Sequence, residues 1–393
     1  MSFASKRRAA TVRFAFSLAS AFLVAGCSSR APDAPDAPSS TSTAALPDIQ
    51  LDAPSELTSW PWPKSQKEAP HKGVTHWTAR ARDNTSVHLI EFDFARNPAL
   101  RFELYSQDED DDKPFDNVVK FWPMGVGQAT SKLNARFRAA KMGTVVAAWN
   151  GPFFGYYRSA PIPLETAFHL APIVLRGETH FNTRNHRWTM GVQYIDNKPV
   201  FKVFHLPGRA LLDREFDFAS GTLQCLIKDG KALKTEPFPM GPNFRKQPVA
   251  STPSEVGHIP YFDHAKFSRA SLAWSRDNSR LYLLLVREPN SDSEGASIDR
   301  LQKWQAQSGG WNVPDLQRFW VSMRKQGRVW NAINSDAGDV AQLAYLLPSH
   351  EYSLISPQGD NPPFEQRTFK PDFPNAPQGG SLSYFYVRDA SAK

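Results

Sequence analysis

The first 46 residues are excluded from any folded core, and this sets how much chain is left to build one. Lys and Arg residues at positions 6–13 precede an apolar stretch at residues 14–25. A cationic start and a short apolar core are typical of a secretory signal, and the core is too short to span a bilayer stably. Residues 28–46 are mostly Ser, Ala, Pro, Asp and Thr, which cannot bury enough surface to fold and predict a tether. About 340 residues remain, enough for one large domain or two small ones.

Cys27 ends this signal in the run Leu-Val-Ala-Gly-Cys. Small residues before a cysteine resemble the lipobox of bacterial lipoproteins. The resemblance implies cleavage before Cys27, a diacylglyceryl thioether on its sulfur and acyl chains that anchor the protein to a membrane. The alternative is an ordinary buried cysteine in an uncleaved anchor. An Asp after the lipidated cysteine often marks retention at the inner membrane, so Ser28 implies the periplasmic side of the outer membrane.

Cleavage at Cys27 also changes the charge balance. The whole chain has 46 basic and 39 acidic residues, and removing the four cations of the signal leaves 42 basic residues against 39. This small excess gives no support for nucleic-acid binding. Cys225 is the only other cysteine, which argues against an intramolecular disulfide even in an exported protein. Its strand-like surroundings predict a buried, inert thiol rather than a nucleophile.

The pattern of apolar residues predicts more strands than helices. Strands are expected at residues 86–94, 99–105, 144–149, 188–195, 199–205, 271–275, 280–286, 329–333 and 381–387. Helices are expected at residues 128–142, after a cap at Ser297, and at residues 314–326, with Gly143 and Gly327 as stop positions. The aromatic and aliphatic stripe of the last helix is assigned to the core. Together these elements predict an α+β fold, a mixed β-sheet with flanking helices.

The expected domain organisation is simple. Residues 1–26 form the signal peptide, residues 27–60 the lipidated cysteine and a disordered tether, and residues 61–393 a single domain whose core spans about residues 86–347.

No motif indicates a cofactor or a metal. The sequence has no GxSxG elbow, HExxH pair, Walker loop or Gly-rich dinucleotide turn. The acidic run at residues 108–112 lacks the Gly and the distant Glu of an EF-hand, so a solvated loop is favoured over a calcium site. His180 and His186 are six residues apart, a poor spacing for metal ligands on one helix face. We therefore expect neither a cofactor nor a metal.

Four segments occur in an order shared with a known family. They are VVAAWNGPFF at residues 145–154, FSRASLAW at 267–274, the apolar run 281–286 followed by GASI at 295–298, and NAINSDAG at 331–338. They resemble the Asn-Gly-x-Phe-Phe turn, the Arg-Ala strand opening, the edge strand with its Gly-x-Ser helix start, and the Asn-x-Asp-x-Gly strand end of the phosphodiester glycosidase domain family. The resemblance spans about residues 86–347.

The resemblance implies hydrolysis of the bond between an anomeric carbon and a phosphodiester, with a carbohydrate or sugar phosphate as substrate. A carboxylate must stabilise the oxocarbenium-like carbon, attack it or activate water, and Asp336 is the candidate. The planar guanidinium of Arg269 would hold the phosphate, and Asn150 a sugar hydroxyl or a phosphate oxygen. Further substrate-binding candidates are Gly151, Gly338 and Asp339.

Several positions depart from the family pattern. Ala337 replaces a Gly, Pro152 removes a backbone donor, and Asp339 adds a carboxylate that would repel a phosphodiester or raise a neighbouring carboxyl pKa. Arg287 and Glu288 replace the Asp-Gly after the central strand.

Two interpretations therefore remain: a lipid-anchored hydrolase, and a catalytically inactive envelope lipoprotein that binds a glycan or a partner. Each candidate residue also has a structural alternative, because Asn150 could form a common turn, Arg269 an ion pair and Asp336 a turn cap.

Overall fold

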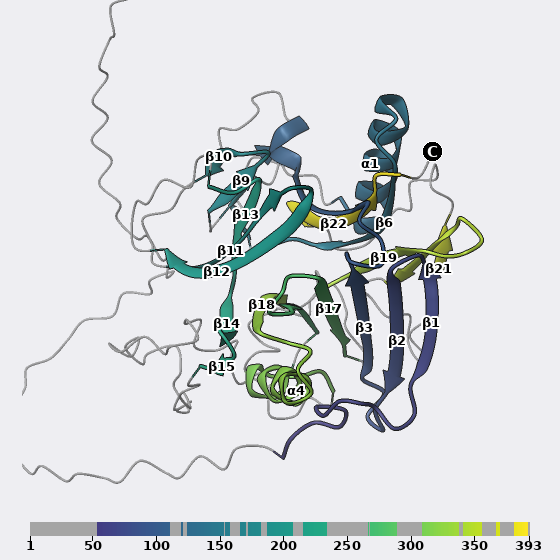
Figure 1. Cartoon of the computed structure of the whole chain (residues 1–393), viewed down its shortest axis with the longest axis vertical. Coiled ribbons are helices and arrows are strands. Elements are labelled where there is room, and N and C mark those ends of the chain that lie inside the picture. Colours follow the sequence, from purple (N-terminus) through teal and green to yellow (C-terminus); the bar gives the residue numbers. More distant parts are fainter. Residues whose placement is uncertain are drawn as a thin grey trace, which may run out of the picture. The chain divides into compact units, whose positions relative to one another are not determined.

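The structure is a computed structural model of the whole chain (Figure 1). It describes residues 53–110, 119–120, 124–152, 154–157, 166–169, 172–181, 187–206, 215–233, 266, 268–288, 309–337, 341–355, 367–369 and 381–391. The signal, the lipobox cysteine and the helix expected after Ser297 lie outside the described residues. Every described residue belongs to one compact unit, Leu51–Lys393.

The largest sheet has eight antiparallel strands. Their order is β1 (Gln66–His71), β2 (Val74–Arg80), β3 (Ser86–Asp93), β17 (Arg280–Arg287), β16 (Arg269–Trp274), β18 (Asn331–Ala337), β14 (Gln224–Lys228) and β15 (Lys231–Ala232). Hairpins join β1 to β2, β2 to β3 and β16 to β17, while β3 pairs with β17 over its full length. This sheet therefore brings together strands that are almost 200 residues apart in the chain.

A second sheet of six strands lies against the inner face of the first (Figure 1). Its order is β21 (Arg367–Phe369), β20 (Tyr352–Ile355), β19 (Leu343–Leu346), β6 (Thr144–Asn150), β22 (Ser383–Asp389) and β4 (Leu100–Ser106). The central strand β6 is buried along almost its whole length, as its continuous apolar sequence predicted.

Two smaller sheets complete the described strands. One contains β10 (Glu178–Phe181), β9 (Ile173–Leu175), β13 (Phe218–Gly221), β11 (Arg187–Ile195) and β12 (Lys198–Leu206) in that order. The other contains β5 (Val119–Lys120), β8 (Thr166–His169) and β7 (Phe154–Tyr157).

The predicted α+β fold with a mixed sheet is wrong. All the strand pairs in the described part of the chain are antiparallel, and two α-helices are described there, α1 (Val126–Ala140) and α4 (Val313–Lys325). Strands were expected at nine places where the structure has strands, although β18 lies two to four residues further along. Short connections such as Asp196-Asn197 between β11 and β12, however, permit only antiparallel pairing. The fold is predominantly β.

Aromatic rings join three sheets in one core. Phe92 of the eight-stranded sheet stacks on Trp149 of the six-stranded sheet with ring centroids 5.9 Å apart. Phe201 of the five-stranded sheet contacts Phe102 at 5.7 Å and Trp274 at 5.9 Å. All five rings are buried. Such large buried rings fix the spacing between the sheets, which in turn positions polar residues at the strand ends.

Helix α1 packs on β6 and β19 of the six-stranded sheet. It begins two residues before the predicted start and ends at Ala140. Lys141, rather than Gly143, takes the left-handed cap position, with φ of 53°. Gly143 also has a positive φ, 101°, and a Cβ there would lie 1.9 Å from the carbonyl oxygen of Asp389. Glycine is therefore required at position 143 by close backbone approach.

Helix α4 covers the opposite face of the eight-stranded sheet. Asn312 caps its first turn by accepting from the Asp315 backbone N–H, and the predicted stripe, including Phe319 and Trp320, is buried. The assignment of these aromatics to the core is confirmed. Residues 53–60, assigned to the tether from sequence, pack against this helix: the Trp60 backbone N–H donates to Ser322 Oγ at 2.8 Å.

Candidate functional site

Asn150 and Asp336 meet where two sheets come together. Asn150 is the last residue of β6, and Asp336 is the penultimate residue of β18. The Asn150 side-chain amide donates to Asp336 Oδ2 at 2.8 Å, and both side chains are fully buried. Residues 186 positions apart in the chain thus form one buried polar pair. Asp336 lies within β18, because that strand extends to Ala337 rather than ending at residue 333 as expected from the sequence.

A second set of hydrogen bonds fixes the orientation of Asn150. Its side-chain oxygen accepts from the Gln342 backbone N–H at 3.1 Å, and its own backbone N–H donates to the Gln342 carbonyl at 3.4 Å. Because the amide oxygen is already accepting, the amide NH₂ must be the group that faces Asp336. The Gln342 side chain accepts from the Val126 N–H at the start of α1, which connects the pair to that helix.

The third catalytic candidate, Arg269, points to the other face of the sheet. Its Nε donates to the Trp311 carbonyl at 3.0 Å, and its strand partner Val286 packs with α4. Ser271, two residues along β16 and therefore on the same face, accepts a hydrogen bond from Trp320 of α4, which confirms that the Arg269 side chain lies on the face covered by α4. The backbone of Arg269 pairs with Ala337, next to Asp336, but its side chain does not join the Asn150–Asp336 pair.

Of the three substrate-binding candidates, the structure describes Gly151 only. The Gly151 backbone N–H donates to the Ser383 carbonyl at 2.7 Å, so it is engaged in the six-stranded sheet rather than turned toward a ligand. A Cβ at Gly151 would lie 2.5 Å from Ser383 Oγ, which explains the glycine by packing. Gly338 and Asp339 lie outside the described residues.

Arg287 is a neighbour of the pair that sequence reasoning did not select. It is fully buried on the inner face of the eight-stranded sheet, and its Nη1 donates to the Ala341 carbonyl at 2.9 Å and to Ser268 Oγ at 3.3 Å. Ala341 precedes Gln342, the backbone partner of Asn150. A buried guanidinium on the same face of the sheet as a buried carboxylate is a signal of a polar site. The sequence carried that signal as an Arg at the end of an otherwise apolar strand.

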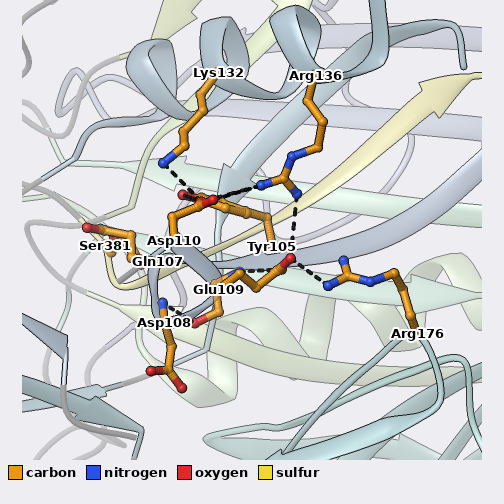
Figure 2. A network of polar contacts seen from close by, with 10 residues as sticks. Tyr105, Gln107, Asp108, Glu109, Asp110, Lys132, Arg136, Arg176 and Ser381 are labelled. Carbon is orange, nitrogen blue, oxygen red and sulfur yellow. Dashed lines mark hydrogen bonds and ion pairs between the residues drawn. The ribbon is translucent and has the colours of Figure 1, made fainter. Parts of the chain in front are cut away.

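The acidic run after β4 forms part of an ion-pair network rather than the predicted solvated loop. Its first residues lie in the short 3₁₀ helix η1 (Gln107–Asp110). Figure 2 shows Asp110 contacting Lys132 and Arg136 of α1, at 2.9 and 3.0 Å, and Glu109 contacting Arg176 at 2.6 Å. The carboxylate of Asp108 points away from these cations (Figure 2) and is buried. The carboxylates of Glu109 and Asp110 are thus paired with protein cations, which accounts for them without calcium.

Three further findings concern the Cys225 thiol, metal-binding groups and membrane-spanning helices. Cys225 is buried in β14, and burial raises the pKa of its thiol, as expected for an inert cysteine. Among the described residues, no group of three His, Cys, Asp or Glu side chains is arranged to hold a metal ion. None of the helices that the structure describes is both long and apolar enough to cross a bilayer.

Comparisons with known proteins give structural neighbours only. No family model matches the sequence, and no curated protein matches it. A similar solved structure is the catalytic domain of zebrafish N-acetylglucosamine-1-phosphodiester alpha-N-acetylglucosaminidase, auto-inhibited by its pro-peptide, with 16% identity and a TM-score of 0.45 over 83% of this chain and 87% of that chain. A hypothetical protein from Synechocystis has 13% identity and a TM-score of 0.36 over 83% of this chain and 64% of that chain. Both TM-scores are below 0.5, so the function is argued from the residues of this chain.

Proposed function

We propose that this chain is a hydrolase that cleaves the bond between a sugar and a phosphodiester. The observation that carries the proposal is the buried hydrogen bond between Asn150 and Asp336. Burying a carboxylate costs several kcal/mol unless it is compensated, and a fold gains little from placing one at the meeting point of two sheets. Perturbed, buried charges gathered at strand ends are typical of active sites.

Each residue of the proposed site has a separate role. The Asp336 carboxylate stabilises the positive charge that develops at the anomeric carbon, or activates the attacking water. Asn150 holds that carboxylate in one orientation through its NH₂ group, since its oxygen is fixed by Gln342. Arg287, rather than Arg269, lies on the same face as Asp336 and supplies the positive charge for the phosphate. The phosphomonoester product is a good leaving group, so a strong general acid is less necessary.

Substrate access requires an opening step. Asn150, Asp336 and Arg287 all have 0% of their surface exposed. A substrate therefore reaches Asp336 only after part of the cover moves aside, and turnover depends on that motion.

We also propose that the chain works at the cell envelope. The supporting observation is the signal-like start and the Leu-Val-Ala-Gly-Cys run ending at Cys27. Lipidation there would hold the domain at the periplasmic side of the outer membrane, near envelope glycans. Mass spectrometry of the mature amino terminus tests this: a diacylglyceryl Cys27 is expected, and an intact Met1 or an unmodified Cys27 contradicts it.

A coupled assay tests the reaction. The substrate is a glycosyl phosphodiester whose second alcohol is p-nitrophenol. Cleavage on the sugar side releases p-nitrophenyl phosphate, which becomes coloured only when a phosphatase is added. In ¹⁸O-labelled water, cleavage at the anomeric carbon puts the label in the sugar, and cleavage of the sugar-side P–O bond puts it in the phosphate. Cleavage of the bond between phosphorus and nitrophenol gives colour without phosphatase. We expect colour from the full chain only with phosphatase. Colour without phosphatase assigns a phosphodiesterase instead, and no product in either arm rejects the hydrolase.

One observation favours the alternative, a catalytically inactive glycan- or partner-binding protein. The Gly151 backbone N–H is engaged with Ser383 and is not available to a substrate. Saturable binding of the same glycosyl phosphodiester by calorimetry, without product over days, would support binding over catalysis.

A further inference from the structure

A chain of three side chains leads from the surface into the layer that contains Asp336. It starts at Glu68 on β1, passes through His76 on β2 and ends at His88 on β3. Glu68 Oε1 lies 2.8 Å from His76 Nδ1, and His76 Nε2 lies 3.2 Å from His88 Nδ1. The Glu68 side chain is 45% exposed, whereas His76 and His88 are 2% and 5% exposed. One end of this chain therefore meets solvent and the other is buried.

The hydrogen-bonding capacity of Glu68 sets the direction of the protons. An ionised carboxylate only accepts, so the Nδ1 of His76 carries a proton and donates to Glu68. The hydrogen bond from His76 holds the pKa of Glu68 below its ordinary value, which keeps it ionised. In neutral His76 the Nε2 is then a lone pair that accepts from His88 Nδ1. The hydroxyl of Thr78, 3.2 Å from the same Nε2, can donate or accept and so serves either protonation state.

With the hydrogen bonds in these directions, the Nε2 of His88 carries no proton and presents a basic lone pair. The atom is buried and has no hydrogen-bond partner among the described residues. Burial first, then a charge on His76 whenever that ring holds a second proton, and then the charges of Arg287 and Arg80, hold the pKa of His88 well below its ordinary value. The ring is therefore neutral near pH 7. An unsatisfied buried acceptor costs about 1–3 kcal/mol, a cost that a purely structural ring has no reason to carry.

The strand register places His88 and Asp336 on the same face of the eight-stranded sheet. His88 pairs with Leu285, Leu285 with Ala270, and Ala270 with Asp336, so these residues form one row across β3, β17, β16 and β18. Directly paired residues of antiparallel strands point to the same side. Arg287 lies two residues beyond Leu285 on that side, beside the row. His88, Arg287 and Asp336 therefore share the layer between the two large sheets.

We propose that Glu68, His76 and His88 form a proton relay for the candidate active site, with His88 Nε2 as its inner end. The proposal rests on the proposed hydrolase function. When water attacks the anomeric carbon, its oxygen forms the new C–O bond while the bond to the phosphate oxygen breaks. Because His88 and Asp336 are three strand spacings apart, the proton passes through water admitted with the substrate to His88 Nε2. The Nδ1 proton of His88 then moves to His76 Nε2, and the Nδ1 proton of His76 moves through Glu68 to solvent. Charge and atoms balance without another reactant.

The described groups around the relay come from the neighbouring strands and from the other large sheet, and they include the Tyr345 side chain, which hydrogen-bonds to Glu68. Arg80 of β2 and Arg287 of β17 act on His88, and both disfavour a lasting positive charge there. The ring of Tyr345, from β19 of the other sheet, packs edge-on against His76 with centroids 4.6 Å apart. The rings of His76 and His88 are nearly parallel, at 16°. Because Arg80 and Arg287 disfavour a lasting positive charge on His88, a proton passes through this ring rather than remaining on it.

Nitrogen NMR of the full chain labelled with ¹⁵N-histidine tests the relay without any substrate. We expect His76 and His88 both to carry their proton on Nδ1 at pH 7, with His88 Nε2 unprotonated. Glu68→Ala, at a half-exposed position that tolerates change, should convert His88 to a mixture of tautomers, and His76→Phe should do the same while keeping a ring in place. His71→Phe, which removes a histidine paired with Asp389 outside the relay, is the matched control and should leave His88 unchanged.

Two results overturn the relay in this experiment. One is a proton on His88 Nε2 in the unaltered chain, and the other is an unchanged His88 tautomer in Glu68→Ala.

The coupled turnover assay supplies the functional arm. We expect Glu68→Ala to lower kcat about ten- to hundredfold near pH 7, with KM within about twofold, and added imidazole buffer to restore kcat by carrying the proton. A merely structural role would not be rescued by buffer. Unchanged kcat in Glu68→Ala refutes the relay, whereas absent turnover in the unaltered chain refutes the hydrolase and leaves the tautomer result to judge the hydrogen-bond order alone.

Discussion

The Asn150–Asp336 pair predicts a different loss of unfolding free energy, and a different dependence of that loss on pH, for two substitutions of Asn150. In Asn150→Ala, Asp336 loses a donor and the Gln342 N–H loses its acceptor. A hydrogen bond to a charged group contributes about 1.5–3 kcal/mol, and a buried N–H left unsatisfied costs about 1–3 kcal/mol. Allowing for partial relaxation, we expect a loss of about 2–4 kcal/mol in the free energy of unfolding at pH 7.

Asn150→Asp keeps the acceptor for Gln342 but replaces the donor with a second carboxylate. Two carboxylates this close cannot both stay ionised, so one of them acquires a raised folded-state pKa. A raised folded-state pKa stabilises the protein at low pH, and that contribution is lost as pH rises. A shared proton would recreate the hydrogen bond, so the defect of Asn150→Asp should shrink by up to about 2.7 kcal/mol between pH 7 and pH 5.

Urea unfolding of the purified full chain, followed by tryptophan fluorescence at both pH values, measures these free energies. Gln193→Ala on β11, a half-buried polar residue of the five-stranded sheet, is a control for substitution alone. Equal pH dependence in the Ala and Asp variants of Asn150 would refute the reasoning, because it would mean that the side chain at position 150 does not contact a carboxylate.

Three further predictions concern other parts of the molecule. Gly143→Ala should cost about 2–4 kcal/mol of unfolding free energy, since it strains a positive φ and drives a Cβ into the Asp389 carbonyl; a loss below about 0.5 kcal/mol would contradict the backbone geometry. Against the effect of burial, hydrogen bonds from Ser391, His71 and Asn97 hold the pKa of Asp389 below its ordinary value, so their stabilisation is present near neutral pH and is lost as pH falls below about 4. Asp389→Asn should therefore be less stable than the unaltered chain at pH 6 but lose less stability on acidification to pH 2, and parallel melting curves would reject this. Cys225 should react with iodoacetamide only after unfolding, as mass spectrometry of native and urea-treated chain would show.

Several elements of the fold were predictable because their sequence patterns are local, whereas short or weakly patterned strands such as β1, β2 and β19–β21 were not predicted. The continuous apolar run before Asn150, the alternation in β11 and β12, and the amphipathic stripe of α4 each gave the correct element within a few residues. The sheet arrangement was not predictable in the same way. A strand pattern states which residues are buried but not which strand lies beside it, so the pairing of β3 with β17 left no local signal.

The candidate site was predictable in part, because the place of a residue within its own strand is a local signal but the neighbouring strand is not. Asn150 ends a strongly apolar strand, and Asp336 nearly ends a strand that alternates small and polar residues; both positions lie at a sheet junction. Arg269 failed to join them because strand residues alternate faces, and its side chain falls on the α4 side. Arg287 and the two relay histidines were missed because none of them belongs to a spaced motif in the sequence. Only the register across four strands shows that they share a layer.

The measurement that tests the central claim most directly compares the full chain with its Asp336→Asn variant in the coupled assay on a glycosyl phosphodiester. Asn keeps the size of the side chain and removes the charge, while far-ultraviolet circular dichroism and the melting curve verify that the variant is folded. The account predicts a fall in kcat/KM on the order of 10³-fold, the scale of losing a positioned catalytic carboxylate. A folded Asp336→Asn chain that turns over the substrate as fast as the unaltered protein would contradict the account.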